Sequence, residues 1–263
     1  LSGGIDSSTI VAMMGVASAR PVETFTVGFS EPAYDESRYA AAVASYLGTD
    51  HHELVVSPSE AREVIPLLPG MYDEPFADSS QIPTFLVSRL ARRHVTVSLA
   101  GDGGDELFGG YDRYRHLDRF HRVMSFWPAP IRRVGGSMLR SVPSSAWDRI
   151  GTGTLARLLP GGSRGRLGHL ANKAARVLAA ADPARTYEAM MTAENSAEEF
   201  VIGSEVPAKG LYDLPEGFSG RGGFEAAMLM DTVAYLPDDL LTKTDRASMA
   251  VSLEARLPFL DPE

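Results

Sequence analysis

The chain opens with Leu1-Ser-Gly-Gly-Ile-Asp-Ser-Ser8, a glycine-rich loop that leads directly into a predicted helix from Ser7 to about Ala19. Its adjacent glycines, Gly3 and Gly4, let backbone N–H groups turn toward an anion without interference from a Cβ atom. The positive end of the helix points at the same place. Further hydroxyl donors come from the serines of this first glycine loop, namely Ser2, Ser7 and Ser8. The loop therefore predicts a binding site for a pyrophosphate.

Asp6 lies inside this predicted phosphate site, although a carboxylate repels a phosphate. A divalent cation between the two groups removes the repulsion, so we expect Mg²⁺ to bridge Asp6 and the pyrophosphate. The structural alternative is an ordinary helix start after a tight turn, with Asp6 or Ser7 as the N-cap.

Beyond this loop, strand-like and helix-like segments alternate. Runs rich in β-branched and aromatic residues predict strands at Glu23–Phe29, His52–Val56 and Val95–Leu99. Helical patterns lie between them, at Ser37–Leu47 with Gly48 as its stop, Ser59–Leu68 and Gln81–Arg93. This alternation predicts an α/β fold, a parallel sheet with helices on both faces. We also expect a strand before Leu1. Ligands of such sheets bind beyond the carboxyl ends of the strands, where both glycine-rich loops fall.

A second glycine loop, Ser98–Tyr111 (SLAGDGGDELFGGY), follows the third predicted strand. Its acids, Asp102, Asp105 and Glu106, lie close together among glycines. Three carboxylates at the end of a strand are electrostatically costly without a cation. The loop therefore predicts a metal ion or a cationic partner, with a solvated turn as the alternative.

From about Tyr111 onward the strand signals disappear. Helices are predicted at Arg115–Ala129, Pro130–Leu139, Ala171–Ala181, Pro183–Met191, Phe224–Tyr235 and Asp238–Val251. We interpret residues 1–263 as one domain that we expect to continue beyond both ends. Within it, residues 1–110 would form a nucleotide-binding α/β core, 111–235 a large helical region and 236–263 a catalytic segment.

Near the end, Leu240–Asp261 (LLTKTDRASMAVSLEARLPFLD) places Lys243 and Arg246 three positions apart, on one face of a predicted helix. Facing a pyrophosphate, these cations would offset the charge that builds up on the leaving group when the α-phosphorus is attacked. Ordinary ion pairs of little energetic weight are the alternative, namely Asp245–Arg246 and Glu254–Arg256.

A fourth segment, Tyr72–Thr84 (YDEPFADSSQIPT), precedes the predicted helix at Gln81. Its polar residues could shape a substrate pocket or, equally, form a capping and turn cluster. The candidates are Asp73, Glu74, Asp78 and Ser79.

The first glycine loop resembles the pyrophosphate-binding loop of N-type ATP pyrophosphatases. The second resembles the SGDGGDELFGGY segment of bacterial asparagine synthetases. Leu240–Asp261 is similar to that family's KxDRxSMAxSLExRxPFLD signature, and Tyr72–Thr84 is similar to its DEPxADxSxIPT stretch. These matches cover the chain to about residue 110 and its last segment. The resemblance implies an adenine nucleotide alpha hydrolase-like fold.

The resemblance also implies roles for individual residues. Asp6 and Asp105 would hold Mg²⁺ on the pyrophosphate of ATP, Asp102 would lie near the reacting carboxylate, and Lys243 or Arg246 would be the catalytic cation. Further ATP contacts would come from Leu1, Ser2, Gly3, Gly4, Ser7, Ser8, Val27, Ala100 and Gly101. Glu106 would join the acids of Tyr72–Thr84 around the substrate. Ala100 replaces the serine usual in the family, which removes one possible side-chain hydrogen bond.

The function implied by the resemblance is ATP-dependent amidation of aspartate to asparagine. The chain would adenylate the aspartate side chain and pass β-aspartyl-AMP to ammonia, releasing AMP and pyrophosphate. In the family an N-terminal glutaminase domain with a cysteine nucleophile supplies the ammonia. Because the chain contains no cysteine, that domain would lie outside it. The resemblance also allows a homodimer.

Two rival functions stay open. A related amidotransferase or a β-lactam-synthetase-like enzyme would adenylate another carboxylate; β-lactam synthetases resemble this chain but carry tyrosine at the position of Asp102, so the acid favours aspartate. A nucleotide-binding module without catalysis is the second rival. Intact Asp6, Asp105 and Lys243 speak against it.

Composition limits other classes of function. The 44% hydrophobic and 22% charged residues are typical of a soluble globular protein. No apolar run approaches the roughly 20 residues of a membrane span, and no leader-like pattern opens the chain, so we expect no membrane partner and a cytoplasmic location. The formal net charge of -9 argues against nucleic-acid binding.

Two further patterns are weaker. Gly161–Gly165 (GGSRG) satisfies the G-x-S-x-G nucleophile pattern, but no strand is predicted before it. His51 and His52 lack carboxylate or histidine partners at metal-ligand spacing in the sequence, so we expect them only at a strand edge.

Overall fold

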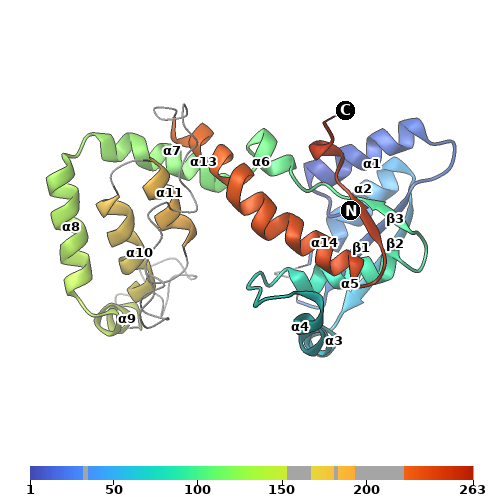
Figure 1. Cartoon of the computed structure of the whole chain (residues 1–263), viewed down its shortest axis with the longest axis horizontal. Coiled ribbons are helices and arrows are strands. Elements are labelled where there is room, and N and C mark those ends of the chain that lie inside the picture. The colour runs from blue at the N-terminus through green and yellow to red at the C-terminus, as the bar shows by residue number, and fades with distance from the viewer. Residues whose placement is uncertain (32–34, 153–166, 181–182, 193–221, 263) are drawn as a thin grey trace. The chain divides into compact units, whose positions relative to one another are not determined.

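The computed structural model describes residues 1–31, 35–152, 167–180, 183–192 and 222–262. The chain forms two compact units, one made of Leu1–Gly110 with Tyr235–Glu263 and the other of Tyr111–Ala234 (Figure 1). Each unit has its own cluster of buried apolar side chains. In the described ranges, no helix combines the length and the apolar character needed to cross a membrane.

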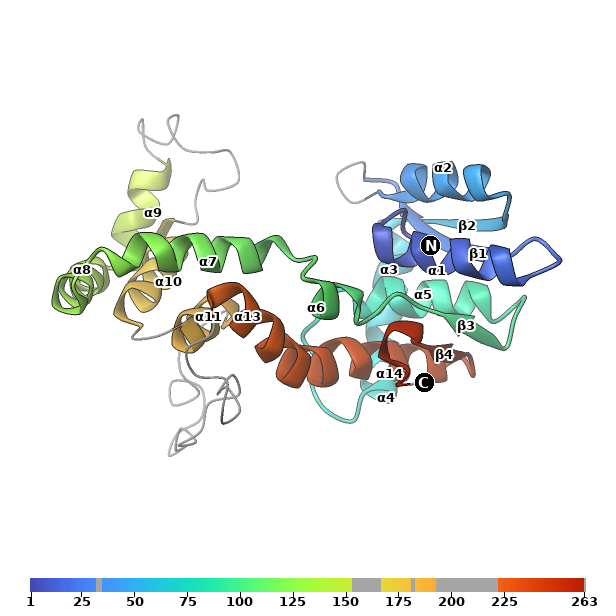
Figure 2. The ribbon, with the colours of Figure 1, turned by 90° about the horizontal axis from the view of Figure 1, so that it is seen from above.

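The first unit contains two short parallel sheets (Figure 2). In one, β1 (Glu23–Phe29) pairs with β2 (Asp50–Val56), with Phe25 opposite His52. In the other, β3 (Val97–Leu99) pairs with β4 (Glu254–Arg256). The predicted strands are therefore present and parallel, although β3 is shorter than predicted. Among the described residues, β1 and β3 are not joined into one continuous sheet.

Helices cover both faces of the β1–β2 sheet. On one face, side chains such as Phe29 and Val56 pack against Phe85 and Leu86 of α5 (Gln81–Ala91). On the other face, a Cβ atom at Gly28 would lie 3.1 Å from Ser37, the first residue of α2 (Ser37–Leu47). The chain leaves α2 through Gly48, whose φ of 67° lies in the left-handed region that glycine tolerates best.

Capping residues and prolines determine where other short helices of this unit begin and end. Ser57 and Glu60 form a capping box at the start of α3 (Pro58–Val64). The helix predicted at Ser59–Leu68 is split, because Pro66 and Pro69 each remove a backbone donor. The remaining elements are α1 (Ile5–Ala17), η1 (Ile65–Leu67), α4 (Leu68–Met71), α6 (Gly104–Phe108) and η5 (Pro258–Leu260).

The break predicted between Tyr235 and Asp238 is wrong. Helical structure continues from α13 (Gly223–Met230) through the π-helical segment η4 (Asp231–Leu241) into α14 (Thr242–Met249). Pro237 lies inside η4. The wider π turn therefore carries a residue that lacks a backbone N–H and that would be expected to interrupt an α-helix.

The second unit is helical in its described part. Its helices are α7 (Asp112–Ser125), α8 (Ala129–Ser141), α9 (Ser144–Thr152), α10 (Leu167–Ala179), α11 (Pro183–Met191) and α13. α9 was not predicted. The core includes the fully buried Tyr114, Leu117, Tyr187 and Met230. The Gly161–Gly165 pattern lies outside the described residues.

Candidate nucleotide site

The first glycine loop ends in an uncapped helix. α1 starts at Ile5, earlier than predicted, and its N-cap is Gly4, which has no side chain to cap the first turn. Asp6 and Ser7 therefore lie within the first turn, and neither of them is the N-cap, which was the alternative role proposed for them. The amino end of α1 can offer backbone N–H groups to an anion.

Gly3 allows this loop to approach α2 closely. Its φ is 83°, and a Cβ atom at this position would lie 2.6 Å from Cβ of Tyr39 and 2.9 Å from the backbone nitrogen of Ala40. A larger residue at this position would therefore be strained and would collide with helix backbone. The conformation of the loop depends on glycine.

Hydrogen bonds fix the residues before α1. Ser2 and Ser7 join their hydroxyl groups at 3.1 Å, and the N–H of Gly4 donates to Oγ of Ser2 at 3.2 Å. The amino group of Leu1 donates to the carbonyl oxygen of Phe25 at 2.8 Å, and Oγ1 of Thr26 donates to the carbonyl oxygen of Leu1. Leu1 therefore lies beside β1. Buried Oγ of Ser8 has no hydrogen-bond partner in the part of the chain that is described.

The two glycine loops contact each other. A Cβ atom at Gly104 would lie 2.7 Å from Oδ2 of Asp6, and one at Gly101 would lie 3.1 Å from the backbone nitrogen of Ser7. Burial raises the pKa of Asp6 above its usual value. Asp105 follows Gly104 directly, and its own Oδ1 turns toward Gly110. The structure thus brings Asp6 against the residue that precedes Asp105.

The second glycine loop is also tied to the last segment of the chain. Oγ1 of Thr244 in α14 donates to Oδ2 of Asp102 at 2.8 Å. The backbone N–H of Ala100 donates to the carbonyl oxygen of Arg256 at 2.9 Å and so extends the β3–β4 pairing. Glu106 is buried, with 1% of its surface exposed. Segments far apart in the sequence therefore meet at this loop.

Lys243 is a buried cation held by the fourth sequence segment. Its Nζ lies 2.7 Å from Oδ2 of Asp78 and donates to Oγ of Ser80 at 2.7 Å. Burial alone would raise the pKa of Asp78, but the hydrogen bonds from Lys243 and Ser80 outweigh it and lower that pKa. Ser80 also donates to Asp78, so Asp78 forms both a turn and an ion pair.

Arg246 has a different environment from Lys243. Its side chain is 48% exposed and lies 3.3 Å from Oδ2 of Asp73. The ion pairs considered as alternatives are also present, at 4.0 Å for Arg246–Asp245 and 2.8 Å for Arg256–Glu254. The helical spacing therefore does not give the two cations a common, equally buried face. Glu74 and Ser79 are exposed.

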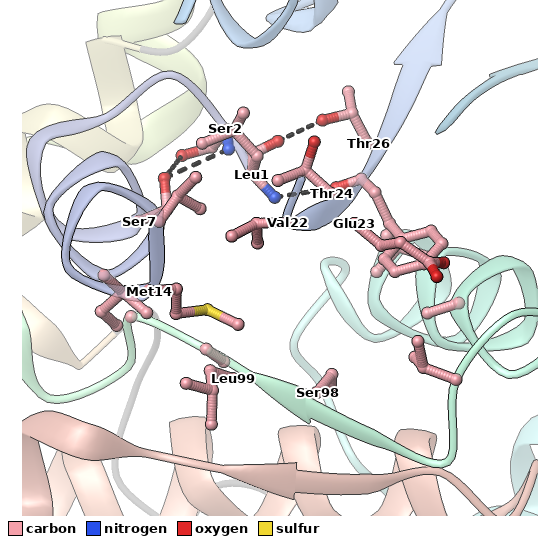
Figure 3. Close-up of a pocket in the computed structure, with 18 of the residues that line it drawn as sticks. Leu1, Ser2, Ser7, Met14, Val22, Glu23, Thr24, Thr26, Ser98 and Leu99 are labelled. Carbon is pink, nitrogen blue, oxygen red and sulfur yellow. Dashed lines mark hydrogen bonds between the residues drawn. The ribbon is translucent and has the colours of Figure 1, made fainter. Parts of the chain in front are cut away.

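A cavity of about 840 Å³ lies between β1 and β3 (Figure 3). Six of the predicted nucleotide residues line it: Leu1, Ser2, Ser7, Val27, Ala100 and Gly101. Elsewhere its wall is mainly apolar, with Ile10, Val11, Met14, Val22 and Val97. Figure 3 shows Leu1, Ser2 and Ser7 along one side of this space and Ser98 and Leu99 of β3 across from them.

Residues 1–263 match the sequence family described as Asparagine synthase. The chain belongs to the asparagine synthase family. A putative glutamine-hydrolyzing asparagine synthetase of Mycobacterium tuberculosis is 34% identical over 267 residues, which cover 100% of this chain and 37% of that protein. Glutamine-hydrolyzing asparagine synthetase 1 of Bacillus subtilis is 32% identical over 99% of this chain and 38% of its own length. The chain thus spans well under half of these curated relatives.

Within this asparagine synthase domain, three residues that were not predicted from the sequence form hydrogen bonds to predicted site residues. Ser80 and Tyr72 contact Lys243, the latter through a hydroxyl group 3.5 Å from the carbonyl oxygen of Lys243. Thr244 contacts Asp102. Each lies next to a predicted site residue, but only the folded chain brings segments more than 140 positions apart into contact.

Proposed function

We propose that this chain is the synthetase part of a glutamine-dependent asparagine synthetase. It binds ATP, catalyses attack of the aspartate side-chain carboxylate on the α-phosphorus, and directs ammonia to the resulting β-aspartyl-AMP. The products are asparagine, AMP and pyrophosphate. The names of the relatives from Mycobacterium and Bacillus support this proposal.

The observation that carries the proposal is the convergence of both glycine loops and the last segment. Asp6 contacts Gly104, and Asp102 accepts a hydrogen bond from Thr244 of α14. A phosphate chain at the amino end of α1 would therefore lie beside a second, acidic loop. Such a combination of backbone donors and carboxylates suits a nucleotide that carries a divalent cation.

The donor set fits Mg²⁺. Asp6 is a partly buried carboxylate whose pKa is raised by burial, and a cation would reverse that direction by favouring the ionised form. We propose that Asp6 and Asp105 supply carboxylate oxygens, the ligand type Mg²⁺ prefers together with phosphate oxygens. When bound, Mg²⁺ would neutralise charge on the pyrophosphate leaving group.

Lys243 is the catalytic cation in this proposal. Asp78 and Ser80 hold its Nζ in one place, so little conformational freedom is lost when it acts on substrate. A fixed positive charge stabilises negative charge that develops on the departing pyrophosphate. Half-exposed Arg246 contributes at longer range to the same field. Asp102, oriented by Thr244, lies near the aspartate carboxylate.

We further propose that β1 and β3 belong to one parallel sheet in the whole protein. Leu1 already bonds to the free edge of β1 through Phe25, and a cavity separates that edge from β3. A strand that leads into Leu1 would pair with both edges. Adenine would then bind at the end of the cavity lined by Leu1, Val27 and Gly101. The glutaminase that supplies ammonia lies outside residues 1–263.

Aspartate-dependent exchange of labelled pyrophosphate into ATP tests the proposal. The measurement uses the full-length protein that contains this chain, with Mg²⁺ and without glutamine. Exchange stimulated by L-aspartate supports an asparagine synthetase. If only another carboxylic acid stimulated exchange, that acid and not aspartate would be the substrate. If no acid stimulated exchange, the chain would be a nucleotide-binding module.

A further inference from the structure

A glutamate and two histidines meet at the amino ends of the strands in the first unit. Ligand atoms of Glu23, His52 and His94 all lie within 4.8 Å of one another. Glu23 is the first residue of β1, His52 lies on β2, and His94 follows α5 on the way to β3. The glycine loops lie at the opposite ends of the strands, so the cluster lies away from both loops, although Glu23 also lines the cavity between β1 and β3 (Figure 3).

Strand register places the cluster on one face of the sheet. Glu23 pairs with Asp50 and Phe25 with His52, so side chains two residues apart on each strand point the same way. His94 reaches this face from a turn in which its N–H donates to the carbonyl oxygen of Ala91 at 2.9 Å. Three separate segments therefore supply the three candidate ligands.

His52 is the central member of this cluster. Its Nε2 lies 3.8 Å from Oε2 of Glu23 and 3.9 Å from Oδ1 of Asp50. This nitrogen is shielded from solvent, yet it finds no hydrogen-bond partner within the described ranges. A buried nitrogen without a partner costs free energy unless something else satisfies it. A cation between the imidazole and the carboxylates would do so.

The two imidazole rings are held close together. The ring centroids of His52 and His94 lie 4.0 Å apart, and Phe25 stacks on His52 at 5.2 Å. Two protonated rings at this separation would repel each other, whereas metal-bound rings are neutral ligands. Phe25 covers the site on one side and limits the rotation of both rings.

We propose that Glu23, His52 and His94 bind a Zn²⁺ ion. Two imidazoles and one carboxylate form a donor set well suited to zinc, with a water molecule in the fourth position. Ligand atoms about 2.0–2.1 Å from zinc in a tetrahedron lie about 3.3 Å apart. The observed atoms, which lie within 4.8 Å of one another, must therefore move closer together when the ion binds. Mg²⁺ prefers oxygen ligands and does not compete well for imidazole. The ion ties β1, β2 and the segment before β3 together.

From their spacing in the sequence, His51 and His52 were expected at a strand edge, without a metal role. His52 and its partners are too far apart in the sequence to form a recognisable spacing, and only the fold unites them. His51 points to the other face, where its Nδ1 lies 2.9 Å from Oγ1 of Thr24. It therefore serves as a matched control for His52.

Zinc titration of the full-length, chelator-treated protein tests this site, in excess Mg²⁺ and without added histidine tags. Co²⁺ serves as a spectroscopic substitute, because its visible absorption reports nitrogen ligands. We expect His52→Ala, His94→Ala and Glu23→Gln each to weaken Zn²⁺ binding by at least about tenfold, and His51→Ala to leave it unchanged.

Zinc should also raise the melting temperature of the wild-type protein but not that of His94→Ala. His94 is exposed, so this variant should fold without metal and keep the test decisive. The proposal would be overturned if the wild type bound no Zn²⁺, or if His52→Ala and His94→Ala bound Zn²⁺ as tightly as the wild type. The result does not depend on whether the chain makes asparagine.

Discussion

Nζ of Lys243 lies 2.7 Å from Oδ2 of Asp78, and both side chains are largely shielded from water. The pair joins α14 to the segment before α5, which is 165 positions away in the sequence. Asp78 was a candidate for the substrate pocket and Lys243 for the pyrophosphate site, and their ion pair explains how the two residues can act together. Asp78 positions the charge of Lys243.

Replacing Asp78 with asparagine should weaken both stability and catalysis. Removing one partner of a mostly buried ion pair leaves Lys243 uncompensated, so we expect a loss of about 2–4 kcal/mol in the free energy of unfolding. Aspartate-dependent pyrophosphate exchange should fall by about tenfold or more. Asp73→Asn is the control. It removes the exposed partner of Arg246 and should change stability by less than about 0.5 kcal/mol in urea unfolding.

The contribution of Asp78 to stability should disappear in acid. Its folded-state pKa lies below its unfolded value of about 3.9, so the stabilisation is complete above that pH and is lost as the pH falls through the lower, folded value. The difference in unfolding free energy between wild type and Asp78→Asn should therefore be constant near neutral pH and shrink below about pH 4. A difference that grows in acid would contradict this assignment.

Gly104→Ala should disturb the contact between the two glycine loops. The added methyl group would lie 2.7 Å from Oδ2 of Asp6 and would push that carboxylate away. We expect kcat/KM for Mg·ATP to fall by about tenfold or more, with a stability loss of about 1–3 kcal/mol. Gly15→Ala in α1 is the control, because no atom lies within 4 Å of its new Cβ. It should stabilise the protein by up to about 1 kcal/mol.

Thr244→Val should weaken the use of aspartate more than the binding of ATP. The substitution keeps the shape of the side chain but removes the hydroxyl group that donates to Asp102. We expect KM for aspartate to rise by about three- to tenfold, while binding of ATP changes little. Thr232→Val is the control: it removes a hydroxyl group that donates to the helix carbonyl oxygen of Met228, and it should leave both constants unchanged. Equal effects of both variants would argue against a specific role for Thr244.

Asp231→Asn should destabilise the helical unit. Asp231 is fully buried and accepts hydrogen bonds from Arg113, Tyr114 and Tyr187, at 2.5 Å, 2.7 Å and 2.6 Å respectively. Loss of its charge leaves Arg113 without its buried counterion, so we expect a loss of about 2–4 kcal/mol in thermal or urea unfolding. Asp112→Asn, at an exposed pair with Arg115, should have little effect.

Local patterns in the sequence predicted the elements of the first unit well. β1 (Glu23–Phe29) and α2 (Ser37–Leu47) have the predicted bounds, because alternating apolar residues and the stop at Gly48 are local signals. The continuous helical passage around Pro237 was missed, since a π-helix depends on its surroundings and has no simple periodic pattern. The relation of β1 to β3 likewise depends on long-range pairing.

The candidate site was predictable as a set of motifs but not as a set of contacts. The glycines and acids of the two loops are visible in the sequence, whereas the pairing of Lys243 with Asp78 and of Thr244 with Asp102 is not. Spacing on a helix also placed Lys243 and Arg246 on one face, and both were candidates for the catalytic cation. Their burial differs because Lys243 pairs with the largely shielded Asp78, whereas Arg246 pairs with the exposed Asp73.

The central claim is that Asp6 and Asp105 hold one divalent cation on ATP. Its most direct test measures the binding of Mn²⁺, in place of Mg²⁺, in the presence of ATP by electron paramagnetic resonance. We expect the full-length protein to bind Mn²⁺ only together with ATP, and Asp6→Asn and Asp105→Asn each to weaken that binding by at least about tenfold. The exposed control Glu63→Gln should bind like the wild type. Undiminished Mn²⁺·ATP binding in both aspartate variants would contradict the account.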